Sequence, residues 1–264
     1  MEVDADPVVE TRRIMTASDA ERLPLRALGG IAVALLCPTI RRLSPPRTYH
    51  DIDLATPSAA AGVTRLLTDL GYDAARRFNT LNGSERLLFH DPAGRRIDVF
   101  VGTLRMCHQL SLDDAFAIPS WTLPPADLVL SKLQIVELTE RDAQDLLALF
   151  ADFELTGSGA VGISVERIER VCRDWGWWRT IGGNLDVVEA LWRTERTDAD
   201  PETVRTLDRG LERVAQLRDV LASSPRPIGW RIRAMVGSRV RWYELPEDVR
   251  SQEPNESGRP PAGP

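Results

Sequence analysis

The sequence has little lysine, histidine and cysteine, and it lacks a long hydrophobic run. Lys132 is the only lysine of the 264-residue chain, which also has three histidines and three cysteines. Because Cys37, Cys107 and Cys172 are odd in number and widely spaced, we expect a reducing compartment rather than a disulfide framework or a zinc knuckle. No stretch approaches the roughly 18 apolar residues of a membrane span, and the acidic start MEVDADPVVE lacks the apolar core of a secretory signal. We therefore expect a cytoplasmic protein without a membrane partner.

The chain also lacks an excess of positive charge. Its formal net charge is −6, with 27% charged and 43% hydrophobic residues, as in ordinary globular proteins. No overall basic field favours nucleic acid, so an RNA contact would depend on a local patch. The length suits one large domain or two modest ones with an ample core.

The few histidines and cysteines form no pattern of nucleophilic catalysis. His50, His90 and His108 have no partners at metal-ligand spacing, and Cys107 and His108 are chain neighbours, which does not place their side chains face to face. His50 follows Tyr49 and precedes an aspartate, so in a strand it points away from that aspartate. We expect no Ser-His-Asp or Cys-His mechanism.

The first hundred residues predict an α/β fold with a mixed sheet. Period-2 and helical patterns alternate, and Gly71 is placed to end a helix. A Pro-Ala-Gly turn between two β-rich runs predicts a hairpin. The expected elements are a helix over 10–23, a strand over 25–28, a helix from 31, a strand over 51–55, a helix over 58–72, and hairpin strands over 86–91 and 96–102.

After residue 123 the pattern becomes helical. Helices are predicted over 124–138, 140–152, 164–178, 184–195 and 201–224, with proline in the first turn of the first one and Ser164 as an N-cap. We expect residues 1–8 to be disordered. The expected organisation is an N-terminal segment over 1–20, an α/β domain over 21–123, a helical domain over 124–224, an Arg/Trp-rich segment over 225–250 and a disordered tail over 251–264.

A glycine pair stands where a strand turns into a helix. Leu28 precedes Gly29 and Gly30, which permit positive φ and a close backbone approach. The helix that follows offers free N–H groups to a phosphate. Glycine pairs are common in turns, so this feature acquires meaning only from its neighbours.

Three aspartates on two predicted strands supply those neighbours. Asp51 and Asp53 share one side of the stretch RTYHDIDLAT, and Asp98 lies within RRIDVFVG. Alternate residues of a strand share a face, so the three carboxylates can converge if the strands are adjacent. Such a cluster is unfavourable without cations and suits Mg²⁺, which takes carboxylate oxygens, water and substrate phosphates. The spacing therefore predicts a site for two Mg²⁺ ions.

The pattern LGGIAVALL, RTYHDIDL and RIDVFV resembles the nucleotidyltransferase superfamily that includes polymerase-β-like enzymes. RTYHDIDL is also similar to a stretch of aminoglycoside nucleotidyltransferases. The segment DLVLSKLQIVELTERDAQDLLAL looks more like AbiEii-type nucleotidyltransferases, which carry a lysine on a helix followed by RDxxDL. The resemblance covers about residues 25–150. Gly30 stands where many members have serine, which removes one hydroxyl from the phosphate turn.

The resemblance implies a catalytic domain over residues 21–123 that uses an NTP and two Mg²⁺ ions. Asp51, Asp53 and Asp98 would then be the metal ligands and catalytic carboxylates. The other implied residues bind nucleotide: Gly29 and Gly30 seat the phosphates, Lys132 contacts the triphosphate, and Asp142 or Asp145 lies near the active centre. Arg47 either holds phosphate, pairs with the aspartates or lies on the surface.

The expected reaction moves a nucleoside monophosphate from an NTP to an acceptor hydroxyl. The acceptor stays open: RNA or tRNA, as for toxin-like relatives with an antitoxin partner, a small compound of the aminoglycoside type, or a protein side chain. A catalytically inactive nucleotide-binding scaffold is the alternative of another class. An RNA acceptor predicts that the Arg/Trp-rich segment faces the cleft, whereas an aminoglycoside-like acceptor predicts acidic residues there.

Two tryptophan-rich stretches have no assigned role. Trp175 and Trp178 are spaced for a helix–helix core, or for stacking on a base. Residues 226–245 combine arginines with aromatic residues, which suits an RNA-binding edge, a surface hairpin or a partner-binding segment. The residues concerned are Arg226, Trp230, Arg231, Arg233, Arg239, Arg241, Trp242 and Tyr243.

Overall fold

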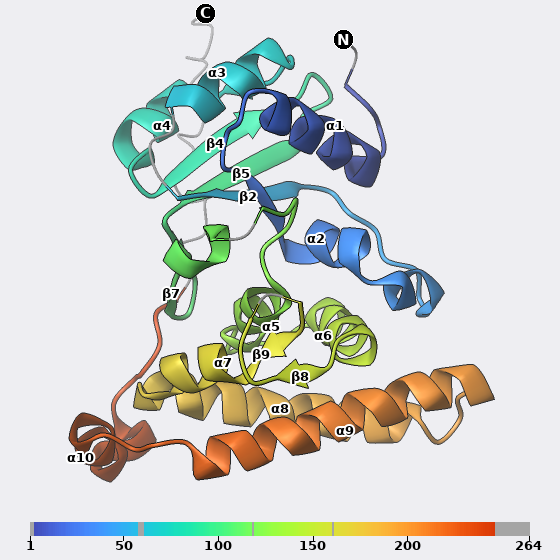
Figure 1. The fold of residues 1–264 in the computed structure, drawn as a ribbon, viewed down its shortest axis with the longest axis vertical. Coiled ribbons are helices and arrows are strands. Elements are labelled where there is room, and N and C mark those ends of the chain that lie inside the picture. Colours follow the sequence, from blue (N-terminus) through green and yellow to red (C-terminus); the bar gives the residue numbers. More distant parts are fainter. Residues whose placement is uncertain (1–2, 58–60, 118, 160, 246–264) are drawn as a thin grey trace, which may run out of the picture.

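A five-stranded mixed sheet lies above a group of helices in the computed structural model, which describes residues 3–57, 61–117, 119–159 and 161–245 (Figure 1). The strand order is β1-β2-β5-β4-β3, and only the central pair β2 and β5 runs parallel. The mixed α/β class is therefore confirmed. The strands are β1 (Arg26–Leu28), β2 (Ile52–Thr56), β3 (Asp73–Ala74), β4 (Arg86–His90) and β5 (Arg96–Val101), with a separate hairpin of β6 (Thr103–Arg105) and β7 (Gln109–Ser111).

The two faces of this sheet differ in chemistry. Residues alternate between the faces of a strand, and one face of the central strands is apolar and fully buried, with Ile52, Leu54, Ile97, Val99 and Phe89. In Figure 1 α1 (Pro7–Ala20) and α3 (Ala61–Asp69) lie on one side of the sheet, with α4 (Arg76–Asn82) at its edge, and the remaining helices lie on the other side. The second face carries aspartates and arginines and looks toward those helices.

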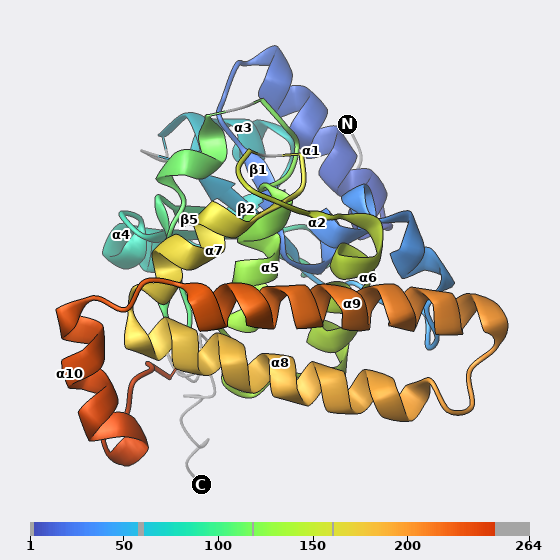
Figure 2. The same cartoon turned by 60° about the horizontal axis from the view of Figure 1, so that its bottom comes forward.

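The helical part begins beneath the sheet with α5 (Pro125–Leu133) and α6 (Glu140–Asp152), and both pack against α2 (Gly29–Leu36). Further along the chain α8 (Trp175–Glu195) and α9 (Pro201–Ser223) form a long antiparallel pair (Figure 2). The predicted hairpin of β4 and β5 and the N-cap Ser164 are confirmed. This part also contains α7 (Val165–Cys172) and α10 (Ile228–Val236), with a two-stranded β8 (Leu155–Thr156) and β9 (Ile163–Ser164) between α6 and α7.

Helix boundaries differ from the expectation where a side chain caps the backbone. The helix predicted over 164–178 is broken, because Asp174 accepts a hydrogen bond from the backbone N–H of Trp177 and starts α8 there. The helix predicted over 124–138 ends at Leu133. The end of α3 agrees with the expectation. Gly71 follows it with φ +97°, and the N–H of Tyr72 donates a hydrogen bond to Leu67 O.

The ends of the chain also depart from the expectation. Pro7 and Val8 lie in α1, because Asp6 caps that helix with Pro7 at its first position, so residues 7–8 are not disordered. Residues 228–236 form α10 instead of a hairpin. The predicted tail over 251–264 lies outside the described residues. Within the described ranges no helix is both long and apolar enough to cross a membrane. Cys37, Cys107 and Cys172 are buried and unpaired.

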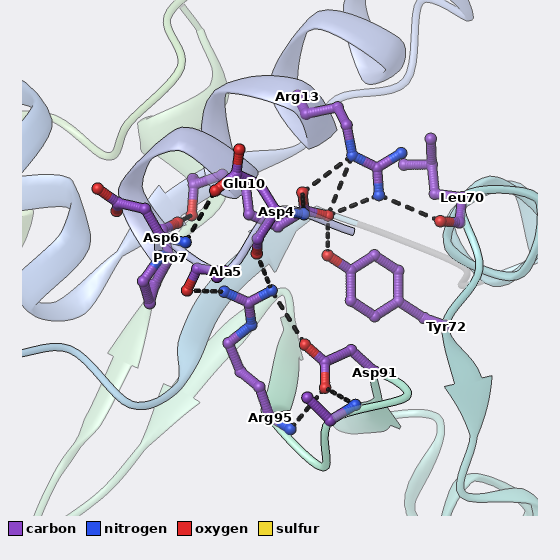
Figure 3. A network of polar contacts seen from close by, with 12 residues as sticks. Asp4, Ala5, Asp6, Pro7, Glu10, Arg13, Leu70, Tyr72, Asp91 and Arg95 are labelled. Carbon is purple, nitrogen blue, oxygen red and sulfur yellow. Dashed lines mark hydrogen bonds and ion pairs between the residues drawn. The ribbon is translucent and has the colours of Figure 1, made fainter. Parts of the chain in front are cut away.

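A buried carboxylate attaches the N-terminal helix to the sheet (Figure 3). Glu10 is fully buried and accepts hydrogen bonds from Arg13, from the hydroxyl of Tyr72 and from the backbone N–H of Asp4. Arg13 in turn donates to Leu70 O. Burial alone would raise the pKa of Glu10, but the hydrogen bonds from Arg13 and Tyr72 outweigh it and hold that pKa below its usual value.

We predict that Glu10→Gln lowers the free energy of unfolding by about 2 kcal/mol at pH 7, because it leaves Arg13 partly buried without its counter-charge. A carboxyl with a depressed pKa stabilises the fold above its unfolded pKa and loses that effect as pH falls through its folded pKa. The difference between wild type and variant therefore shrinks below about pH 4. Urea unfolding at several pH values measures it.

Glu202→Gln is the matched control, since its ion pair with Arg42 is exposed on both sides. It should cost less than about 1 kcal/mol. Equal losses for the two variants would show that the buried network adds nothing to stability.

Candidate active site

Two aspartates lie side by side on the polar face of the sheet. In the parallel pairing of β2 and β5, Asp53 stands opposite Asp98, so the predicted adjacency of these strands is confirmed. Asp51 lies one residue before β2 and is exposed, Asp53 is half-buried, and Asp98 has 0% exposed surface. Because residues two apart share a face, the three predicted carboxylates belong to the same side of the sheet.

This face forms one wall of a cleft whose opposite wall is helical. A cavity of about 780 Å³ is lined by Asp51, Asp53, Lys132 and Asp142 among others. A smaller pocket of about 290 Å³ shares these four residues and adds Gly30, Arg47, Tyr49, His50, Thr139 and Arg141. Predicted site residues before residue 60, such as Asp51 and Asp53, therefore line the same cleft as Lys132 and Asp142 of the helical part.

The glycine turn borders the same carboxylates. β1 ends at Leu28 as predicted, but α2 begins at Gly29, two residues before the expected start at residue 31. Gly29 has φ +68°, and a Cβ placed there would lie 2.5 Å from Asp53 Oδ2. A Cβ at Gly30 would lie 2.8 Å from the guanidinium of Arg47. Any side chain at Gly29 would strain the backbone and displace the carboxylate of Asp53.

Lys132 lies at the centre of a four-residue charge cluster. Its Nζ is 2.9 Å from Asp142 Oδ1 and 2.9 Å from Asp145 Oδ2. Arg47 donates from Nε and Nη2 to the two oxygens of Asp145, at 3.0 Å each. Two cations and two anions therefore balance. Burial alone would lower the pKa of Lys132, but Asp145 and Asp142 raise it, so the ammonium stays charged.

Local structure explains part of this cluster. Asp142 is the third residue of α6 and forms a capping box with Thr139, so the helix start itself orients its carboxylate. Asp145 follows one turn later and is fully buried. Of the three roles left open for Arg47, the structure shows a pairing with an aspartate, although the partner is Asp145 and not Asp51 or Asp53.

The carboxyl group of Asp53 has a strongly raised pKa. Burial raises its pKa to about 7, together with the negative charges of Asp51 and Asp98, while Lys132 and Arg86 oppose this shift. Within the described residues no hydrogen bond or ion pair reaches the carboxylate of Asp51 or Asp53. Two such neighbours are ready-made ligands for a cation.

Asp98 is paired instead with two arginines that the sequence analysis missed. Arg86 lies with Nε and Nη2 at 2.8 Å from Oδ1, and Arg96 lies with Nε at 2.7 Å from Oδ2. Arg96 was accessible to prediction, because it stands two residues before Asp98 on the same face. Arg86 comes from β4 and depends on the register of the hairpin.

The donor set fits a divalent cation in part. Mg²⁺ in proteins is typically bound by one or two carboxylates plus water and substrate phosphates, and Asp51 and Asp53 provide two open ones. Asp98 in its observed pairing does not fit, since both of its oxygens accept from guanidinium groups. Over the described part of the chain, no group of three His, Cys, Asp or Glu side chains is arranged to hold a metal ion.

The Arg/Trp-rich segment contacts the helical part, and its arginines do not line the cleft. Trp175 packs against Trp242 and Trp178 against Trp230. Arg226 lies over Trp230 with its guanidinium carbon 4.9 Å from the ring centre, and several further arginines also stack on aromatic rings: Arg233 on Trp175, Arg179 on Trp242 and Arg241 on Tyr243. From this segment only Glu244 and Leu245 line the larger cavity among the described residues, and residues 246–250 lie outside them.

Within the described residues none of the three histidines belongs to a group of three side chains that could hold a metal ion. His50 is exposed at the smaller pocket, and His108 is buried, stacked on Trp177 and 2.8 Å from the hydroxyl of Thr180. Burial lowers the pKa of His108, so this ring is neutral near pH 7. It packs α8 against the loop before β7.

We predict that Asp53→Asn stabilises the metal-free protein at neutral pH by about 1 kcal/mol, a value that allows for solvent screening of a half-open carboxylate. A carboxyl whose folded pKa is raised holds its proton longer in the folded state, so its contribution to stability falls as pH rises from 3.8 to about 7. The variant should gain over wild type through this window and keep a constant lead above it.

Thermal unfolding between pH 4 and pH 8 measures this difference, with exposed Asp219→Asn as a control that should follow wild type. A variant less stable than wild type at pH 8 would contradict the repulsion between Asp53 and its acidic neighbours.

Comparisons with known proteins assign no family to this chain. No family model matches it, and no curated protein matches it. The crystal structure of JHP933 from Helicobacter pylori is similar with a TM-score of 0.38 and 9% identity, over 89% of this chain and 99% of that one. A likeness of this strength carries no argument about function, which therefore depends on the geometry of the cleft.

Proposed function

We propose that this protein is a Mg²⁺-dependent nucleotidyltransferase, which moves a nucleoside monophosphate from an NTP to an acceptor hydroxyl. One observation supports this proposal above the others. Open carboxylates at Asp51 and Asp53 and an ammonium at Lys132 line a single cleft, next to the glycine turn at the start of α2. Phosphoryl transfer depends on the positioning of the substrates and on charge compensation more than on covalent chemistry, and the residues of this cleft suit both.

In this proposal each residue has a separate task. Asp51 and Asp53 would hold the divalent cation, which when bound supplies Lewis-acid activation of the hydroxyl and stabilises the pyrophosphate. Gly29 and Gly30 leave the backbone open to the phosphates. Lys132, held at its place by Asp142 and Asp145, compensates charge on the leaving pyrophosphate. Asp98 would assist the acceptor hydroxyl only after it is released from its two arginines.

The acceptor has three candidate classes: RNA, a small hydroxyl compound and a protein side chain. Glu85 and Glu244 join the aspartates on the cavity wall, while the arginines of the C-terminal segment stack on tryptophans. Acidic residues on the wall are what the aminoglycoside-like alternative predicts, whereas Arg86, Arg96 and Arg105 on the same wall suit a phosphate backbone, so the charge of the cavity is compatible with either class. A total cell extract contains all three classes and a direct assay separates them.

We predict that the protein transfers label from at least one of the four α-labelled NTPs into an acceptor of a cell extract in the presence of Mg²⁺. The Asp51→Asn/Asp53→Asn variant should be at least about 100-fold less active than wild type, because it removes both open carboxylates. Asp219→Asn is the matched control. Label in RNA, protein or small molecules names the acceptor class.

Two outcomes would contradict this proposal in different ways. NTP with Mg²⁺ that raises the melting temperature without any transfer would indicate an inactive nucleotide-binding scaffold. No binding of NTP and Mg²⁺ at all would show that the three aspartates have a structural role.

We predict that Lys132→Arg lowers the transfer rate by about 10- to 100-fold and weakens NTP binding. A guanidinium is planar and larger than an ammonium, and so cannot replace a compact charge between two carboxylates while contacting phosphate. The positive charge is kept, but the larger group lies between Asp142 and the fully buried Asp145, so the melting temperature should fall and is measured alongside. Steady-state kinetics measures the rate, and unchanged kinetics would remove Lys132 from the nucleotide site.

A further inference from the structure

The charge balance around Asp98 is uneven. One carboxylate with no exposed surface accepts from two guanidinium groups, which gives this group a net charge of +1. Next to it Asp51 and Asp53 have no ion pair in the described part of the chain. The two arginines therefore satisfy Asp98 and also offset part of the negative charge of its neighbours.

Arg86 and Arg96 line the cleft in addition to pairing with Asp98. Arg86 and Arg96 line the cavity of about 780 Å³ that contains Asp51, Asp53 and Lys132, and their side chains are 23% and 35% exposed. A guanidinium has five N–H donors, of which Asp98 uses only some. The remaining donors of Arg86 and Arg96 are not among the buried and unsatisfied side-chain atoms of the described residues, which agrees with the partial exposure of both side chains.

Entry of a cation would make this pairing unfavourable. A divalent ion held by Asp51 and Asp53 lies beside Asp98, because Asp53 and Asp98 are register partners on adjacent strands. It attracts the carboxylate of Asp98 and repels the guanidinium groups. A displaced guanidinium needs a new anion, since an unpaired charge in a half-buried site is costly.

We propose that Arg86 and Arg96 exchange partners: they hold Asp98 while the cleft lacks a divalent cation, and they bind the phosphate oxygens of a polyphosphate once the cation takes over Asp98. This inference rests on the proposed function and adds a second phosphate-binding wall, opposite Lys132. Guanidinium groups form paired hydrogen bonds with phosphate as readily as with carboxylate, so the exchange conserves their hydrogen bonds.

The ring of Phe100 supports this movement on one side. The guanidinium carbon of Arg86 lies 5.1 Å from the centre of that ring, which also lines the cavity. A flat apolar surface lets the group slide between the two anions without passing into open water. Arg105, in contrast, lines the same cavity but contacts Glu85 and not Asp98.

The test measures binding of Mg²⁺ alone, and of inorganic triphosphate with Mg²⁺, by calorimetry on the full chain. We expect Arg96→Gln and Arg86→Gln each to tighten Mg²⁺ binding by about 5- to 10-fold and to weaken triphosphate binding by about 10-fold. These opposite signs are the signature of an exchange. Arg105→Gln, which changes the same charge without touching Asp98, should alter each affinity by less than about 2-fold.

A second variant keeps the test valid if an arginine variant fails to fold. Asp98→Asn releases both guanidinium groups, so triphosphate should bind it more tightly than wild type in the absence of Mg²⁺. The exchange would be overturned if the arginine variants left both affinities unchanged, lowered both, or changed them no more than Arg105→Gln does. It would also be overturned if the wild type bound no Mg²⁺. Neither ligand requires catalysis, so a protein that shows the exchange but transfers no label would refute only the proposed function.

Discussion

The parallel pairing of β2 and β5 sets the electrostatic problem that the rest of the site answers. It places Asp53 directly beside Asp98, with Asp51 two residues away on the same side. Carboxylates so close cannot all be ionised at low cost, and the pKa of Asp53 is raised first by its burial and then by the charges of Asp51 and Asp98. The apolar face of the same strands fixes this register, because a shift by one residue would turn the aspartates into the core.

The answer is a set of opposite charges from distant parts of the chain. Arg86 and Arg96 neutralise Asp98 from the sheet itself. On the facing wall Lys132 and Arg47 are matched by Asp142 and Asp145. That second cluster joins α5, α6 and the segment before β2, so one group of ion pairs holds the helical part against the strand that carries the open carboxylates.

Much of this arrangement was predictable because it depends on local spacing. The glycine turn, the two aspartates before and within β2 and the hairpin that carries Asp98 follow from short-range patterns, whereas the place of Lys132 was implied by the family resemblance. The arginine partners of Asp98 and Asp145 did not follow from such patterns, because Arg86 reaches Asp98 from the neighbouring strand and Arg47 reaches Asp145 from a distant part of the chain. The start of α8 was missed for another reason: the cap by Asp174 interrupts an otherwise helical pattern.

A cleft that neutralises its own charges restricts what can bind it. A cation alone would leave the two arginines without an anion, and an anion alone would compete with Asp98 for them. In the proposed exchange, a ligand that brings both signs together would satisfy every group at once. Asp51 and Asp53 would hold the cation, and Asp98 would turn to it. Arg86 and Arg96 would bind the anion. The burial of Asp53 beside two other carboxylates adds to the same preference, because a bound cation would compensate a negative charge that is costly there. On these grounds the ligand we propose for this cleft is a metal–polyphosphate complex rather than either component alone.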